Sequence, residues 1–401
     1  MAHHPSTPTP HFSAIKTGLA FRPFFWLGAL FVVMCMSIWW SFWRGNVSLH
    51  PLGGMIWWHQ HEMLFGFVAA IVAGFLLTAV QTWTGLPSLK GVALWLVVLL
   101  WGVARLLIAY PMGVAPIVIM MIDVAFLVVV ALCMASLVIR AKKWRNLVFV
   151  PLLAILCIAN AGMHWGQMNG QAAVVLQSAY LAMWLFISIV IIVGGRVIPF
   201  FTARALNLSL APSPKFIELL TIISTFSVCV FQLLRMCAVQ VPGWLFAIPL
   251  ALLVVLNSKR LAGWGIGRCW PQPLLWGLHL SYAFVILGSF LWLLAELNLV
   301  AVDLALHTLS IGVLLAIILA MTARVSLGHT GRPMQALPGL SLALGCLFVA
   351  ALLRGVVLWA WPQGVLWIYQ ASLVLSIMAF LWFLVQYTIP LWSARVDQRP
   401  G

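Results

Sequence analysis

Apolar residues dominate this chain in long stretches that are separated by short breaks at glycine, proline and charged residues. Most stretches are about 20 residues long, which lets a helix cross a bilayer core of ~30 Å. Polar and apolar residues do not alternate with period two, and the stretches are too long for barrel strands. We therefore predict an all-α polytopic membrane protein of about twelve transmembrane helices. The expected spans are 24–43, 58–80, 91–110, 114–139, 147–165, 173–197, 216–238, 243–256, 273–294, 302–323, 338–360 and 365–390.

Basic residues are distributed unevenly between the two sides of these spans. If the N-terminus is cytoplasmic, seventeen of the 21 Lys and Arg residues lie in the tails or in the loops that follow even-numbered spans. Of the remainder, only Arg44 borders a loop on the opposite side, while Arg105, Arg235 and Arg354 lie within spans. Because cytoplasmic loops are enriched in Lys and Arg, we expect both termini in the cytoplasm of a bacterium, with the chain as a multi-pass protein of the inner membrane.

The composition excludes a water-soluble fold. Apolar residues make up 64% of the chain and charged residues only 7%, whereas a soluble domain carries about a quarter charged residues. The net charge of +15 sits at span ends and indicates topology rather than nucleic-acid binding. The seven cysteines form no CxxC pair, so packing is their expected role. We expect a disordered cytoplasmic tail at 1–20, one transmembrane helical domain at 21–392, and a cytoplasmic tail at 393–401.

The strongest chemical signal is WWHQHEMLFGF at 57–67, where His59, His61 and Glu62 open an otherwise apolar helix. Ionisable residues in a bilayer are costly and mark functional sites, and imidazole is the commonest metal ligand. Because successive residues turn by about 100°, His59 and His61 point about 200° apart. They therefore bind two separate metal centres, or one binds a metal and the other controls access to it. Alternatively, both face lipid headgroups or water. Glu62 has no basic partner in its own loop, so we expect it to carry protons, or else to orient a ligand.

A second histidine signal lies in the tenth span, where Asp303 precedes His307 by four residues on the same helix face. The carboxylate can hold the imidazole N–H and make the other nitrogen a better ligand, or the histidine can bond to another helix. The second and tenth spans also share a glycine five residues after the histidine (His61 and Gly66, His307 and Gly312) and a similar Thr-Ala…Thr-Gly-x-Pro end. This similarity is typical of a parallel repeat, and chance explains it equally well.

Two further ionisable residues are candidates, one at the periplasmic edge of the membrane and one deep inside it. His164 lies between two methionines at a span end, where thioether beside imidazole suits copper(I), although methionines are also common at interfaces. Asp123 lies about ten residues into the fourth span. It is expected to pair with Arg105 or Arg235 within the membrane, to be protonated, or to belong to a proton path.

The candidates on the cytoplasmic half form a separate layer. His279 in span nine either binds a second metal or bonds to a carbonyl group, with Tyr282 on a neighbouring face to support it. Arg196 and Arg324 follow spans six and ten, where a guanidinium matches the carboxylates of a cofactor such as haem through bidentate pairing. Topology alone also explains these two arginines.

Taken together, the motifs resemble the NnrS family of haem- and copper-containing membrane proteins associated with nitric oxide and denitrification. The matching elements, in order, are FRPFF at 21, WHQHEMLFGF at 58, GFLLTAVQTWTG at 74, GGRVIPFFT at 194, HLSY at 279, and LHTLSIG at 306 leading into MTARVSLGHTGRP at 321. The resemblance implies a twelve-helix fold, haem b with copper, and protection against nitrosative stress. The site residues that it implies are His59, His61, Glu62, Arg196, His279, His307, Arg324 and His329.

Three functions are compatible with these features. The first is a redox enzyme or scavenger, in which a haem held by His59 or His61 together with His307 binds nitric oxide or a related small nitrogen oxide, with electrons from an unknown donor. The second is a multi-span transporter, and the third is a haem-based sensor or metal-handling protein without turnover. Histidines at metal-compatible positions favour the first. Because no CxxCH motif is present, any haem is expected to be held non-covalently.

Overall fold

The protein is a bundle of membrane-spanning helices. The structure, a computed structural model, describes residues 18–397. Within that range twelve helices are long and apolar enough to cross a membrane, and no strand is present. The predicted all-α polytopic fold is therefore confirmed. Of the expected tails, residues 1–17 and 398–401 lie outside the described residues.

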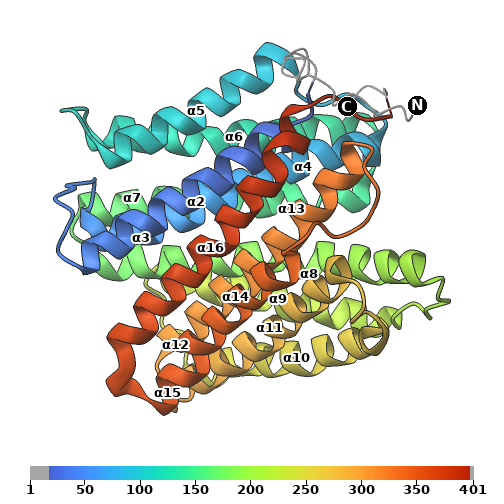
Figure 1. The fold of residues 1–401 in the computed structure, drawn as a ribbon. Helices are drawn as coiled ribbons and strands as arrows, with labels where there is room; N and C mark the ends of the chain where they lie inside the picture. Colours follow the sequence, from blue (N-terminus) through green and yellow to red (C-terminus); the bar gives the residue numbers. More distant parts are fainter. Residues whose placement is uncertain (1–17, 398–401) are drawn as a thin grey trace.

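Nine spans are single helices, and three are broken into shorter segments (Figure 1). The single helices are α2 (Phe21–Trp43), α5 (Gly91–Ala109), α6 (Pro116–Arg140), α7 (Phe149–Met168), α8 (Ala172–Leu206), α9 (Lys215–Met236), α10 (Gly243–Ala262), α11 (Pro273–Glu296) and α16 (Val365–Trp392). The broken spans are α3 (Gly54–His61), η1 (Glu62–Val68) and α4 (Ala69–Thr84); α12 (Val302–His307), η4 (Thr308–Leu315) and α13 (Ala316–His329); and α14 (Leu340–Leu352), η5 (Leu353–Val357) and α15 (Leu358–Ala360).

The eighth span is longer than its apolar stretch predicted. We expected it to end at residue 256, but α10 continues to Ala262 and carries Arg260 into the protein. Arg260 is only 3% exposed, and its Nε donates to Glu218 Oε1 at 3.0 Å. A paired arginine can thus lie inside a helix bundle, whereas the sequence pattern treats it as a loop residue.

The second, sixth and tenth spans form the interior of the bundle. In each of these spans, 78% of an apolar 18-residue stretch is buried against other parts of the chain. The buried share of the corresponding stretch is 33–56% in the other nine spans. The three interior spans are those that contain α3–η1–α4, α8 and α12–η4–α13. The second and tenth spans, which carry His59, His61 and His307, are therefore shielded from lipid, and this lowers the cost of their polar side chains.

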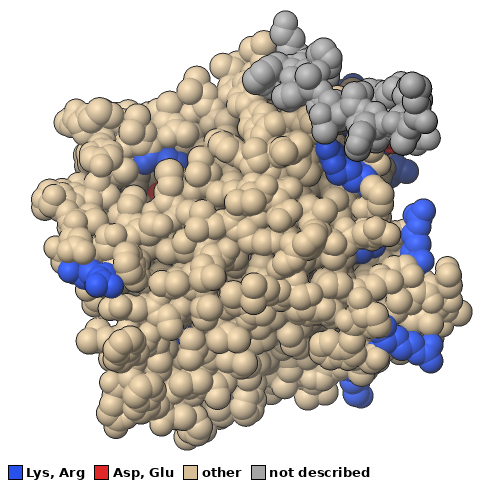
Figure 2. Space-filling view, viewed as in Figure 1, with Lys and Arg blue, Asp and Glu red and all other residues tan. Residues whose placement is uncertain are grey.

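The first and last spans are neighbours. Helix α2 packs along α16, and Arg22 Nη1 donates to the carbonyl oxygens of Leu391 and Ser393, both at 2.7 Å. These contacts hold the start of the first span beside the end of the last. Figure 2 shows most of the visible Lys and Arg side chains at this end of the bundle, on the right. The charge asymmetry expected from the sequence is thus visible on this face.

The orientation can be tested with reporter fusions. Because basic loops stay in the cytoplasm, fusions after Lys143 and Arg260 should report cytoplasm, and fusions after Asn169 and Asn298 should report periplasm. Alkaline phosphatase and fluorescent-protein fusions at each point would measure this. A reversed pair would contradict the assigned orientation.

Each broken span contains one π-helical segment, and each segment contains one crowded glycine. A Cβ atom at Gly66 would lie 2.8 Å from Glu62 Oε2, while one at Gly312 would meet the ring of Phe284 and one at Gly355 would meet Thr308 Oγ1. π-Helical turns inside α-helices are rare and are frequently found at functional sites. The glycines allow neighbouring helices to approach these turns.

Gly355→Ala should therefore destabilise the protein by roughly 1–3 kcal/mol, since overpacking forces backbone shifts in a close-packed interior. Gly345→Ala in the same span is the matched control, because a Cβ atom there meets nothing within 4 Å. Thermal unfolding of both variants in detergent measures the difference. Equal stabilities would mean that the backbone around η5 adapts without cost.

Candidate metal centre and adjoining cavity

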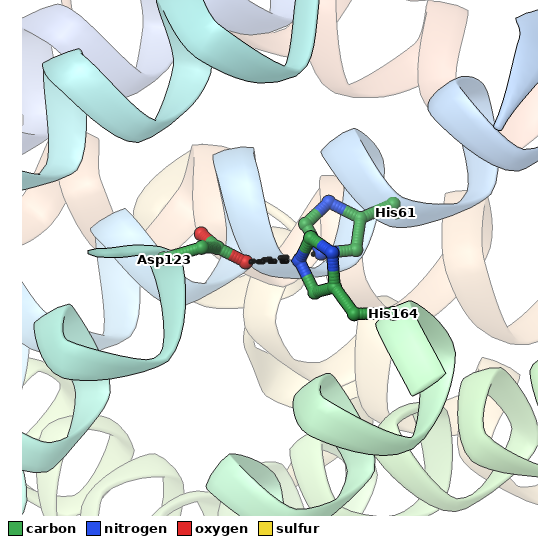
Figure 3. A group of neighbouring side chains, drawn as sticks. All are labelled: His61, Asp123 and His164. Atoms are coloured by element: carbon green, nitrogen blue, oxygen red, sulfur yellow. Dashed lines mark hydrogen bonds and ion pairs between the residues drawn. The ribbon is translucent and has the colours of Figure 1, made fainter. Parts of the chain in front are cut away.

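Three buried side chains from three spans converge near one end of the bundle (Figure 3). His61 is the last residue of α3, Asp123 lies in α6 and His164 lies in α7. The Nε2 atoms of both histidines lie 3.1 Å from Asp123 Oδ2. The ligand atoms all lie within 4.8 Å of one another, and the three residues are at most 1% exposed. This His–Asp–His group could hold a metal ion.

Three more polar side chains complete this cluster. Arg105 Nη1 donates to Glu62 Oε1 at 2.7 Å, and Arg105 Nη2 also pairs with Asp123. Asn160 Nδ2 donates to Asp123 Oδ2 at 2.8 Å. His61 Nδ1 lies 2.9 Å from Glu62 Oε1. The prediction that Asp123 pairs with an in-membrane arginine is confirmed, and the partner is Arg105. The same arginine is the basic partner that Glu62 lacks in its own loop.

Trp57 fixes the positions of the two histidines. Its ring stacks on His61 with centroids 4.5 Å apart and meets the His164 ring edge-on at 5.1 Å. Its indole N–H donates to the carbonyl oxygen of Met163 at 3.1 Å. One buried tryptophan on α3 thus ties the first histidine to the helix that carries the second.

A cavity of about 260 Å³ lies on the other side of α3. This is many times the ~10–15 Å³ that holds one water molecule. Leucine, isoleucine, methionine and tryptophan side chains form most of its wall. The polar residues in the wall are His59, Gln60, Tyr180, Asp303, His307, Ser310, Arg354, Tyr369, Ser372 and Ser376.

All three π-helical segments of the described chain line this cavity. Segment η1 contributes Met63, Leu64 and Val68, and η5 contributes Arg354; the residues from η4 are Ser310, Ile311, Leu314 and Leu315. A π turn re-aims the side chains of a helix, and such turns cluster at functional sites. Their concentration around one cavity makes it a candidate binding site.

The two histidines of the cavity wall differ in their hydrogen bonds. Arg354 Nη2 donates to His307 Nε2 at 2.6 Å, and His307 Nδ1 lies 2.9 Å from the carbonyl oxygen of Asp303 and 3.1 Å from its carboxylate. Both nitrogens of His307 are therefore occupied. The His59 ring stacks on Trp39 with centroids 4.3 Å apart, and its buried Nδ1 has no hydrogen-bond partner. Of the two histidines in the cavity wall, His59 is therefore the one with a ring nitrogen that makes no hydrogen bond.

These contacts divide the predicted residues between the cavity wall and the polar cluster. His59 and His307 share the cavity wall, whereas His61 belongs with Glu62 and His164 in the cluster. The angular separation of His59 and His61 along their helix therefore directs them to opposite sides, one to the cavity and one to the cluster. That each side holds its own metal stays a prediction.

The candidates on the cytoplasmic half are not part of either centre. His279 Nδ1 lies 3.0 Å from the carbonyl oxygen of Leu275, and its Nε2 lies 3.3 Å from that of Trp264. Tyr282 donates to Asn257 Oδ1 at 2.5 Å and also bonds to Arg260, so its hydroxyl does not support His279. These contacts match the carbonyl-bonded alternative for His279.

The remaining candidates from the motifs also lie apart from the cavity. Arg196 Nη1 donates to Asn146 Oδ1 at 3.2 Å. The guanidinium of Arg324 lies 4.2 Å above the ring of Phe201, and the His329 ring packs 5.3 Å from that of Phe21. None of the three lines the cavity or contacts the cluster. Haem binding by these residues stays a prediction that these contacts do not support.

Sequence reasoning missed Asn160 and the role of Arg354. Asn160 precedes His164 by four residues in an apolar span, so the same helix-face argument that paired Asp303 with His307 would have found it. Arg354 was noted only as a basic residue within a span. Nothing in the sequence connects it to His307, because the two lie on separate spans.

The fold and this site define a class: polytopic membrane proteins with a buried histidine–carboxylate group that could hold a metal ion. The chain belongs to the NnrS family, since the family model described as NnrS protein matches residues 17–395. Membership links the protein to the response to nitric oxide. No curated protein matches the sequence.

Proposed function

We propose that this protein binds haem b in the cavity beside His59 and His307, takes up nitric oxide there, and protects a bacterium from nitrosative stress at its inner membrane. The observation that carries this proposal is the convergence of all three π-helical segments on one cavity that contains two histidines. Membership in the NnrS family is the reason for choosing haem and nitric oxide as the proposed ligands.

The residues of the cavity fit a haem. Haem iron takes a histidine nitrogen, and its propionates pair with cations such as arginine. His59 Nδ1 and Arg354 Nε are buried polar atoms without a partner, and both residues line the cavity. His59 and His307 would hold the iron, and Arg354 would pair with a propionate. Haem, when bound, supplies an iron that can bind nitric oxide.

The side chains around the cavity hold His307 and Arg354 in position to bind the haem. Asp303 holds His307 Nδ1 and thereby orients the ring. The Arg354 guanidinium lies 3.7 Å above the Tyr369 ring, which limits its movement when it leaves His307. The apolar part of the wall suits a small uncharged molecule such as nitric oxide.

The His61–Asp123–His164 group is the proposed copper site. Imidazole nitrogens suit copper, and two of them point at one carboxylate oxygen at equal distances of 3.1 Å. Copper there would lie on the opposite side of α3 from the haem. The proposal retains Glu62 as a group that orients His61 through its carboxylate.

An absorption spectrum of the purified protein tests the proposed function. We expect a Soret band that shifts on anaerobic addition of nitric oxide. His307→Ala should abolish or grossly change the spectrum, while His279→Ala, which removes a carbonyl-bonded histidine, should leave it unchanged. An unchanged spectrum in His307→Ala together with a changed one in His279→Ala would move the haem to the opposite end. No Soret band in the wild-type protein would leave transport as the leading function.

The same preparation separates an enzyme from a binder. Reduction of nitric oxide to nitrous oxide joins two molecules of nitric oxide with two electrons and two protons and releases water. Nitrous oxide formation after addition of an electron donor would identify a reductase. Reversible binding without consumption would identify a scavenger or sensor.

A further inference from the structure

The six acidic residues of the chain all lie in its described part, and each one lies beside an arginine. Four of them have an arginine that pairs with no other acidic residue: Glu218 with Arg260, Glu296 with Arg235, Asp303 with Arg354, and Asp397 with Arg395. The two others, Glu62 and Asp123, share Arg105. The cluster around the His–Asp–His group is therefore the one place where two carboxylates meet a single arginine.

This cluster is short of one positive charge. With neutral histidines, two carboxylates and one guanidinium carry a net charge of −1. Glu62 and Asp123 are 0% and 1% exposed, and Arg105 is 6% exposed, so water compensates little of it. An uncompensated charge in an apolar interior costs several kcal/mol. Among the described residues no second lysine or arginine pairs with either carboxylate.

The contacts of His61 indicate where in the cluster the missing positive charge would lie. Its Nδ1 faces Glu62 Oε1 at 2.9 Å, and its Nε2 faces Asn160 Oδ1 at 2.9 Å and Asp123 Oδ2 at 3.1 Å. All three are acceptor oxygens, because the Asn160 amide nitrogen is used by Asp123. A neutral imidazole donates from one nitrogen only. The contacts of the other nitrogen therefore need a metal ion or an additional proton, which either His61 or one of the facing carboxylates would carry.

The second histidine favours the metal ion. A proton would complete the hydrogen bonds of His61, whereas a metal ion would also use His164, whose Nε2 lies at hydrogen-bond distance, 3.1 Å, from the same Asp123 oxygen. Two imidazoles and one carboxylate converging from three helices make a ligand set. Hard cations of the alkali and alkaline-earth groups prefer oxygen ligands, whereas imidazole prefers transition metals.

We infer that the site is built for one monovalent transition-metal cation, copper(I), and that Arg105 sets this preference by leaving the cluster one charge short. A divalent ion would change the net charge of the cluster from −1 to +1 instead of bringing it to zero. This inference rests on the proposed function only in taking copper as the ion. Arg105 acts as a specificity-determining residue without being a ligand.

Charge-changing variants that keep all three ligands test the inference. The net charge of the cluster becomes zero in Glu62→Gln and −2 in Arg105→Gln, and Arg105→Lys keeps it at −1. Copper(I) and zinc(II) affinities are measured on the purified protein by competition with chelators of known affinity. Copper(I) affinity should fall at least tenfold in Glu62→Gln. Zinc(II) affinity relative to copper(I) should rise at least tenfold in Arg105→Gln and stay at the wild-type value in Arg105→Lys.

Glu296→Gln is the matched control, since it removes a carboxylate from another arginine pair and should change neither affinity. The haem spectrum is recorded in parallel, so that loss of haem and loss of copper are separate results. If Arg105→Gln fails to fold, Glu62→Gln still gives its own result. Unchanged affinity ratios in both variants would overturn the role of Arg105. Haem-loaded wild-type protein that binds no copper(I) would assign the missing charge to a proton within the cluster.

Discussion

His59→Ala should remove haem and spare copper, whereas His61→Ala should remove copper and spare haem. The two residues are separated by one position on α3, yet His59 lines the cavity and stacks on Trp39, while His61 stacks on Trp57 and contacts Asp123. Loss of a residue that merely orients a ligand costs ~10–100-fold in metal affinity, and loss of the ligand itself should cost at least as much. Haem absorbance and copper content per chain, measured on one preparation, give both results.

Gln60→Ala is the control for this experiment. Gln60 lies between the two histidines and lines the same cavity, but its amide is a poor ligand for either metal. The variant should retain both cofactors. Parallel loss of haem and copper in each histidine variant would mean that the two sites are not separate, and that α3 supplies a single centre.

The number and type of the helices could be predicted from the sequence because hydropathy alone decides which segments enter a bilayer. The angular argument for His59 and His61 also succeeded, since it depends only on helix geometry. Helix ends were less predictable. Arg260 lies inside α10 because Glu218 on another helix pairs with it, and the local sequence does not contain that information.

The composition of each centre could not be predicted, because it depends on which helices are neighbours. Arg105 was one of two possible partners for Asp123, and its simultaneous contact with Glu62 depends on three spans meeting. The link between Arg354 and His307 has the same origin. The similarity of the second and tenth spans did carry structural information. In both, a π-helical segment begins directly after the histidine and contains the shared glycine, Gly66 or Gly312.

Arg105→Ala should be the most destabilising replacement of any paired arginine in the protein. It leaves two carboxylates, Glu62 and Asp123, buried without a cation. Removing one partner of a buried ion pair typically costs ~3–5 kcal/mol, and here two carboxylates lose the same partner.

Arg235→Ala provides the comparison, because it leaves only Glu296, and the side chains of that pair are 21% and 10% exposed. Water can reach this carboxylate, so the loss should be smaller. The free energies of unfolding are compared on metal-free protein in detergent. Adding zinc(II) should then recover part of the stability of Arg105→Ala, since a divalent ion neutralises the two carboxylates, and should leave Arg235→Ala unchanged. Equal destabilisation of the two variants, or no recovery with zinc(II), would mean that Arg105 does not neutralise the charge of this cluster.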